Sequence, residues 1–187
     1  MRHTAPRELG KDQVVVINVG VIGCGDVAMH SYLPGLQALG QRARVVALFD
    51  IVASRVEQAR ALFPDARGYT DYDSFLAHDG ERMDLVFNLT PAPLHRDITA
   101  RALEAGYNVY SEKPIASTLE DAQELTRVAR ERGLRLFCAP ATMVTNRMLW
   151  LKQFLDEGTI GRPFFAKAHI GNMGPAAWRL RKGTAAS

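Results

Sequence analysis

The chain has 187 residues, of which 47% are hydrophobic and 23% charged, and its formal net charge is +3. This composition is typical of one folded domain with room for the start of a second, and it excludes collagen-like and low-complexity chains. The basic residues accompany no recognition motif and no apolar run approaches the ~18 residues of a membrane helix, so we expect neither a nucleic-acid nor a membrane partner.

The first predicted strand and helix enclose a glycine-rich turn. After a polar stretch, 1–12, expected to be disordered or frayed, a β-branched run leads directly into GCGDVA at 23–28. This G-x-G-x-x-A pattern permits a tight turn whose backbone N–H groups, at the start of a helix, can bind a pyrophosphate. A purely structural strand–turn–helix is the alternative. The helix is predicted over 26–39, with Gly40 as its end.

The second predicted strand, 44–49, ends in an acid, Asp50. This acid follows the glycines by roughly 20 residues or more, where a carboxylate can accept hydrogen bonds from ribose hydroxyls. A surface acid that ends a strand is the alternative. Because a carboxylate repels a 2′-phosphate, we predict NAD rather than NADP as the cofactor. Arg55, in a helix predicted over 53–62, could still approach such a phosphate.

The remaining elements continue the alternation of strands and helices. After a short connection we expect strands over 84–89, 107–110, 134–138 and 164–170, and helices over 94–105, 117–132 and 146–156. The second of these helices opens on Ser117-Thr118-Leu119-Glu120, an S-x-x-E capping box. Such alternation predicts an α/β fold with a doubly wound parallel sheet, the Rossmann form. We expect 13–140 to form this domain, and 141–187 a linking helix plus the first strand of a truncated substrate domain.

Two turns follow predicted strands and carry polar side chains. Thr90, Pro91 and His95 follow one strand, and Glu112, Lys113 and Pro114 follow the next. Ligands of such sheets bind beyond the carboxyl ends of the strands, which favours these turns as binding residues. The alternatives are a self-satisfied turn for the first group and a surface ion pair for the second. Proline biases Lys113 toward an extended backbone, which would project its side chain into the cleft.

With these motifs the chain resembles the glucose–fructose oxidoreductase / inositol dehydrogenase / MocA family (Gfo/Idh/MocA). The resemblance lies in VGVIGCGDVAMHSYLPGL, the acid after the second strand, DLVFNLTPAPLHRDITARALEAGYNVYSEKPIASTLEDAQEL and LDEGTIGRPFFA. It implies an NAD(P)-dependent dehydrogenase that transfers a hydride between nicotinamide and a sugar, polyol or related hydroxyl compound. Family members continue into a second domain that supplies an Asp and a His, often as D-x-x-x-H, and no such pattern follows here. A non-catalytic dinucleotide-binding module, truncated or a partner subunit, therefore stays open as an alternative.

The resemblance also assigns roles to individual residues. Lys113 would be catalytic, holding the reacting hydroxyl and stabilising or deprotonating its alkoxide as the hydride leaves. Glu112 would contact the nicotinamide ribose, and Asp26 would cap the first helix while its backbone N–H faces the ligand. The predicted cofactor contacts are Gly23, Gly25, Asp26, Val27, Asp50, Thr90, Pro91, His95, Glu112 and Lys113. No metal ligand is predicted.

The sequence also predicts where the protein is located and what it binds. Cys24 lies in the glycine-rich turn and Cys138 in a strand that we expect to be interior. The two cysteines indicate neither a disulfide framework nor a zinc site, which predicts a reducing, cytoplasmic location. The predicted ligand besides the cofactor is a small-molecule sugar or polyol. The apolar nicotinamide face of a lone first domain predicts a homo-oligomer or pairing with another chain.

Overall fold

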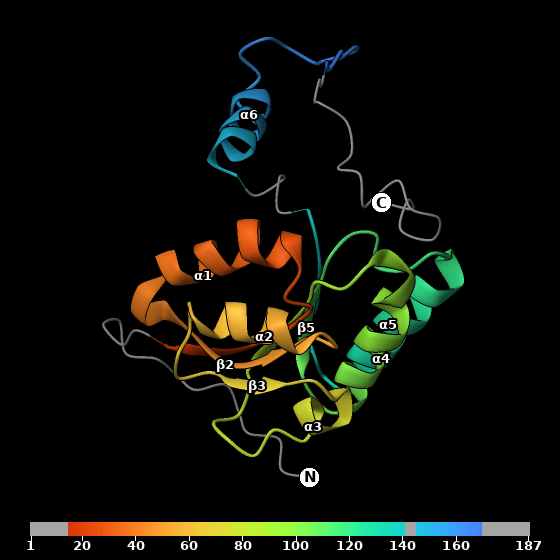
Figure 1. Ribbon diagram of the computed structural model, residues 1–187. Helices are drawn as coiled ribbons and strands as arrows, with labels where there is room; N and C mark the ends of the chain where they lie inside the picture. The colour runs from red at the N-terminus through yellow and green to blue at the C-terminus, as the bar shows by residue number, and fades with distance from the viewer. Residues whose placement is uncertain (1–14, 141–144, 170–187) are drawn as a thin grey trace. The chain divides into compact units, whose positions relative to one another are not determined.

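The computed structural model describes residues 15–140 and 145–169 of the chain (Figure 1). Its centre is a six-stranded sheet with the order β3-β2-β1-β4-β5-β6. The strands are β1 (Ile17–Ile22), β2 (Ala43–Phe49), β3 (Arg67–Tyr69), β4 (Leu85–Asn88), β5 (Asn108–Ser111) and β6 (Leu136–Cys138). Strand β1 pairs in parallel with β2, β2 with β3, and β5 with β6. This is the strand order of the Rossmann fold, so the predicted fold class is confirmed.

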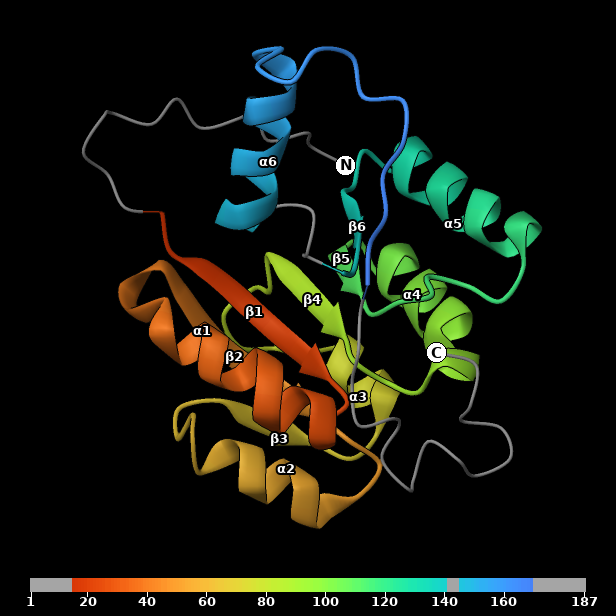
Figure 2. The same cartoon turned by 90° about the horizontal axis from the view of Figure 1, so that it is seen from above.

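The chain divides into two compact units, 1–86 and 87–187, which we describe one at a time. In the first unit, helices η1 (Ala28–Tyr32), α1 (Leu33–Ala38) and α2 (Ala53–Arg60) lie on one side of β1–β3, and α3 (Tyr72–Leu76) lies on the other (Figures 1 and 2). A short 3₁₀ turn, η2 (Gly40–Arg42), precedes β2. Helix α2 buries Val56 and Ala59, three positions apart, as one face of a helix requires.

The second unit holds the end of β4, β5 and β6 with η3 (Ala92–Leu94), α4 (His95–Glu104), α5 (Leu119–Glu131) and α6 (Asn146–Asp156). Helices α4 and α5 lie side by side in both views (Figures 1 and 2). They bury small and branched apolar side chains, namely Ala102 and Leu103 from α4 and Leu125 and Ala129 from α5. No helix in the described part of the chain is both long and apolar enough to cross a membrane.

The first predicted helix is interrupted by a π-helical turn. Its helical residues run over 26–38, but the Leu33 N–H donates to the Ala28 carbonyl, five positions back, which defines η1. Pro34, in the first turn of α1, has no N–H to donate to the residue four positions back. The wider π turn therefore stands where an ordinary α-helical bond is missing.

Three further expectations are corrected by the structure. The connection before β4 contains a strand, β3, and a helix, α3, neither of which was predicted. Helix α5 begins one position later than the capping box indicated, because Thr118 and not Ser117 is its N-cap: the Thr118 hydroxyl accepts the Asp121 N–H at 3.1 Å. The described part of the predicted strand over 164–170, residues 164–169, forms no strand, and no described strand pairs with it.

The predicted interior strand that ends in Cys138 is also corrected. In the strand order β6 is the last strand, and Cys138 is exposed. The predicted linking helix over 146–156 is confirmed as α6. The 1–12 stretch, predicted to be disordered or frayed, lies outside the described residues, as do 141–144 and 170–187 of the predicted second domain. The predicted domain boundaries therefore stay predictions.

Candidate functional site

The first group of site residues, the glycine-turn cluster (residues 23–28 with Asp50), lies where β1 and β2 end. Gly23 has a φ of +90°, a conformation that favours glycine, and its N–H donates to the Phe49 carbonyl at 2.7 Å. A Cβ built on Gly25 would meet no atom within 4 Å, so the turn is open on that side. The helical bond pattern starts when Met29 donates to the Gly25 carbonyl, so the N–H groups of the preceding turn lack helical partners. This geometry can bind an anion.

Asp50 holds the glycine turn in place. The residue is 5% exposed. One carboxylate oxygen, Oδ2, accepts the Cys24 N–H at 2.9 Å, and the other, Oδ1, accepts the Val52 N–H at 2.9 Å. Each oxygen has two lone pairs, so the carboxylate can still accept ribose hydroxyls. The Arg55 guanidinium lies 3.8 Å from Oδ1, with its side chain 53% exposed.

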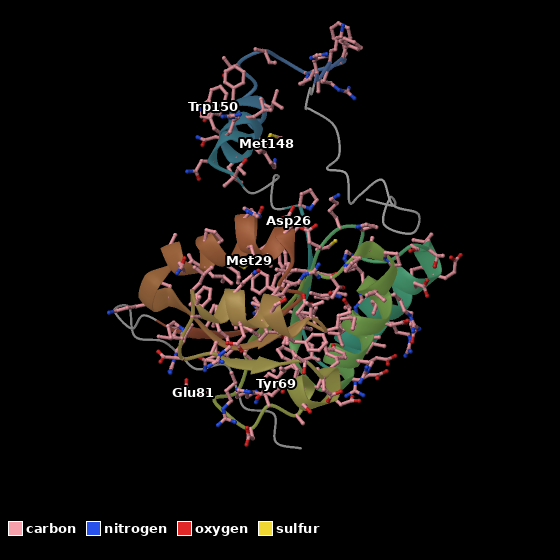
Figure 3. The ribbon with its side chains drawn as sticks, in the orientation of Figure 1. Asp26, Met29, Tyr69, Glu81, Met148 and Trp150 are labelled. Carbon is pink, nitrogen blue, oxygen red and sulfur yellow. The ribbon has the colours of Figure 1, made fainter. Side chains whose placement is uncertain are left out.

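The cluster also contains Asp26, Val27 and Cys24. Asp26 is exposed in the first helical turn (Figure 3). Its Oδ1 lies 3.3 Å from His30 Nδ1. The Asp26 contact that the structure records is thus with His30 rather than a helix cap. Val27 is half-buried with helical backbone angles. Burial, reinforced by the charge of Asp50, raises the pKa of the Cys24 thiol to about 12, so this cysteine is no nucleophile.

The second group, the strand-end cluster (Asn88, Thr90, His95, Thr99 and residues 112–114), belongs to residues 87–187. Asn88 is fully buried. Its Nδ2 donates to the His95 carbonyl at 3.2 Å and to Thr99 Oγ1 at 3.0 Å. Its Oδ1 accepts from Thr90, from the N–H at 3.3 Å and from the hydroxyl at 2.6 Å. The Asn88 amide therefore fixes the turn after β4 to the start of α4.

The sequence analysis overlooked Asn88 and Thr99. A signal was present, because an asparagine in an otherwise apolar strand must satisfy its amide if the strand is buried. The predicted residues Thr90 and His95 are half-buried and 1% exposed, respectively, while Pro91 is exposed just before η3. The structure thus brings Thr90 and His95 together around a residue that the motif did not mark.

Glu112 and Lys113 follow β5 in the same cluster. The Glu112 N–H donates to the Asn88 carbonyl at 2.9 Å, and Glu112 Oε2 accepts the Lys113 N–H at 2.9 Å. Both residues are half-buried, and the Lys113–Pro114 peptide bond is cis. The Pro114 carbonyl lies 2.6 Å from His95 Nδ1. Lys113 is therefore held between a carboxylate on one side and an anchored proline on the other.

Among the described residues, no three or more His, Cys, Asp and Glu side chains gather where they could hold a metal ion. The chemistry that these residues offer is anion binding at the glycine turn, and an amine and a carboxylate at the end of β5. Residues 17–139 match a family described as an oxidoreductase family with an NAD-binding Rossmann fold (GFO_IDH_MocA). The chain belongs to this oxidoreductase family.

Relatives in the Gfo/Idh/MocA family act on or bind different compounds. The scyllo-inositol 2-dehydrogenase (NADP(+)) IolW of Bacillus subtilis is 28% identical, over 94% of this chain and 48% of its own length. The 3-ketoreductase KijD10 of Actinomadura kijaniata, solved with NADP and TDP-benzene, is 34% identical with a TM-score of 0.70, over 77% of this chain and 43% of its own. The WlbA dehydrogenase of Bordetella pertussis, solved with NADH and UDP-GlcNAcA, is 27% identical with a TM-score of 0.70, over 78% and 41%. The chain thus spans less than half of the length of each.

Proposed function

We propose that the chain binds NAD through the glycine-turn cluster and contributes Lys113 to hydride transfer on a sugar, polyol or related hydroxyl compound. The observation that carries the proposal is the turn itself, in which Asp50 holds the Cys24 N–H while the space beside Gly25 stays open. An open glycine next to unpaired helical N–H groups fits a pyrophosphate, and the Asp50 carboxylate fits the adjacent ribose. A bound nicotinamide supplies the acceptor or donor of the hydride.

Lys113 carries the proton chemistry in this proposal. Its ammonium group would donate a hydrogen bond to the reacting oxygen and hold negative charge that develops there when the hydride leaves. The backbone of Lys113 is fixed by Glu112 Oε2 at 2.9 Å, which limits the directions its side chain can take. Glu112 would contact the nicotinamide ribose, with Thr90 and Pro91 along the cofactor.

We propose NAD rather than NADP as the preferred cofactor. The Asp50 carboxylate repels a 2′-phosphate, and the Arg55 guanidinium lies 3.8 Å from that same carboxylate. The relatives include proteins named with NADP and with NADH, so the family alone favours neither. NADH should therefore bind more tightly than NADPH.

Substrate class, partners and location extend the same proposal. The scyllo-inositol and the UDP-GlcNAcA named with two of the relatives support a polyol or sugar substrate. Exposed aromatic side chains such as Trp150 on α6, which is 62% exposed, support a homo-oligomer or pairing with another chain (Figure 3). We expect the protein in the cytoplasm.

A fluorescence titration with NADH and NADPH tests the cofactor assignment. We expect Gly25→Val to weaken NADH binding by about a hundredfold, because the side chain would fill the open space that the pyrophosphate approaches. The unfolding temperature should change little, since no atom lies within 4 Å of the new Cβ. Gly35→Val is the matched control, because Gly35 in α1 also has no atom within 4 Å. Wild-type chain that binds neither nucleotide, or equal loss in both variants, would refute the assignment.

A further inference from the structure

His95 links two turns that are far apart in the sequence. Its Nε2 lies 2.7 Å from the Thr90 carbonyl oxygen, and its Nδ1 lies 2.6 Å from the Pro114 carbonyl oxygen. Thr90 belongs to the turn after β4, and Pro114 belongs to the turn after β5. The imidazole ring therefore spans from the first turn to the residue next to Lys113.

Both partners of the ring are acceptors. A carbonyl oxygen cannot donate, so each contact is a hydrogen bond when the ring nitrogen carries a proton. Either neutral tautomer makes one of these bonds, and the imidazolium makes both. Neither ring nitrogen is left for a ligand, which sets His95 apart from Thr90 and Glu112.

The surroundings of His95 leave no ready substitute for these bonds. His95 is 1% exposed, so water has little access to the ring, and Thr90 and Pro114 are themselves half-buried. Its own backbone carbonyl is held by Asn88 Nδ2 at 3.2 Å, which fixes the start of α4 beneath the ring. Buried carbonyl groups that lose their donor without gaining a water are costly, so the turns would rearrange if the ring were removed.

We infer that His95 is a positioning residue: it clamps the Lys113–Pro114 turn to the Thr90 turn and so fixes the residues that meet the nicotinamide half of the cofactor. This inference deepens the proposed function and rests on it for the identity of the ligand. It replaces the sequence-based expectation that His95 itself contacts the cofactor. The adenosine diphosphate half, assigned to Gly23, Gly25 and Asp50, does not depend on the clamp.

Calorimetric titrations with two probes, NADH and ADP, separate these halves. His95→Leu should weaken NADH binding by about tenfold, the effect of a misplaced hydrogen-bonding turn, and should change ADP binding less than about twofold. His95→Gln keeps one donor and should fall between wild type and His95→Leu. Leu125→Ala is the stability control: it truncates a fully buried side chain of α5 that belongs to neither cluster. It should leave the NADH-to-ADP ratio unchanged.

Amide hydrogen exchange without ligand tests the clamp independently of cofactor binding. In His95→Leu the Lys113 and Thr90 amides should exchange at least about tenfold faster, while those of α5 keep their rates. Unchanged exchange at Lys113, or NADH binding that survives His95→Leu, would overturn the inference. Equal losses for NADH and ADP in His95→Leu, as in Leu125→Ala, would show a role in stability alone and overturn it as well. Wild-type chain that binds neither probe would instead refute the proposed function, and the exchange rates would still decide the clamp.

Discussion

The two clusters hold their residues by different means. In the glycine-turn cluster, one buried carboxylate, Asp50, accepts two backbone N–H groups, and the turn is otherwise shaped by its own backbone. In the strand-end cluster, the Asn88 and Thr90 side chains bond to each other, and the Asn88 and His95 side chains bond to backbone carbonyls. The first cluster depends on a single charged group, whereas the second shares its hydrogen bonds among several neutral or titratable ones.

This difference decides which residues a motif can reveal. A tight turn with a φ of +90° demands glycine at a fixed position, so the demand is visible in the sequence. The partners in the strand-end cluster are 11 positions apart for Asn88 and Thr99, and 19 apart for His95 and Pro114. Their pairing exists only once β4, α4 and β5 are folded. Substitutions in the two clusters should therefore have different consequences.

The substitution with the largest expected effect, Lys113→Ala, should lower turnover without lowering the affinity for NADH. If Lys113 holds the reacting oxygen, Lys113→Ala should lower turnover by about 10³-fold or more, while NADH affinity changes less than about twofold. Reduction of NAD, followed by absorbance with a panel of inositols, hexoses and sugar nucleotides, measures the rate.

Lys152→Ala is the control for this prediction, since Lys152 is an exposed lysine on α6 whose partner is Asp156 at 2.6 Å. Turnover that survives Lys113→Ala would contradict the catalytic role. If the wild-type chain binds NADH but turns over no compound of the panel, the non-catalytic module becomes the better description.

Much of the fold could be predicted because its signals are local. The β-branched runs of β1 and β2 and the glycine turn between them follow from sequence spacing, and both lie where expected. Strand β3 was missed because its three residues include Gly68, so it has almost no alternating pattern. The strand predicted over 164–170 failed for the opposite reason: its apolar pattern is present, but a strand also needs a neighbour to pair with, which sequence spacing does not supply.

The site divides along the same line. The predictions for Gly23, Gly25 and Asp50 rest on their spacing, and the structure adds that Asp50 holds the turn itself. The sequence offered only a weak signal for Asn88, a polar residue in an apolar strand, and it did not indicate which residues its amide would bond. The cofactor contact of His95 stays a prediction, and its bond to the Pro114 carbonyl could not be derived from a motif.

The two cysteines allow a comparison of the buried glycine turn with the exposed strand β6. Burial first, and then the charge of Asp50, raise the pKa of Cys24 to about 12, so at pH 8 only about one in 10⁴ of these thiols is ionised. Cys138, the last residue of β6, pairs in register with Ser111 of β5 and is exposed. Partial burial nevertheless raises the pKa of its thiol as well. Iodoacetamide at pH 8 should therefore alkylate Cys138 at least about a hundredfold faster than Cys24.

Mass spectrometry of the peptides measures the two rates, and urea-unfolded chain, in which both thiols are accessible, is the control. The pKa of Cys24 is higher in the folded chain than its ordinary value of 9.0. This thiol therefore favours the folded state below pH 9, and the contribution is lost as the pH rises toward 12. Equal alkylation of the two cysteines in native protein would contradict the burial of the glycine turn.

The smallest of these effects tests whether one carboxylate holds the first cluster. Asp50→Asn preserves the shape of the side chain but replaces one oxygen with an NH₂ group, which faces a backbone N–H of Cys24 or Val52. One buried donor is then left without an acceptor, and a charge-assisted bond is lost, so the free energy of unfolding should fall by about 2–3 kcal/mol in urea titrations at pH 7. Asp84→Asn is the matched control, because Asp84 Oδ2 also accepts a backbone N–H, that of Asn18, at 2.9 Å but at the surface.

Water can replace the bond that Asp84→Asn loses, so that variant should lose less than about 1 kcal/mol. Equal losses in the two variants would mean that the glycine turn keeps its shape without the buried carboxylate. Asp50 would then be free to serve a ribose alone, and the contrast between the clusters would disappear. A larger loss in Asp50→Asn, together with weaker NADH binding, would show that one side chain both shapes the turn and prepares it for the cofactor. Stability and binding would then be linked at Asp50, whereas in the strand-end cluster Lys113→Ala should leave cofactor affinity in place.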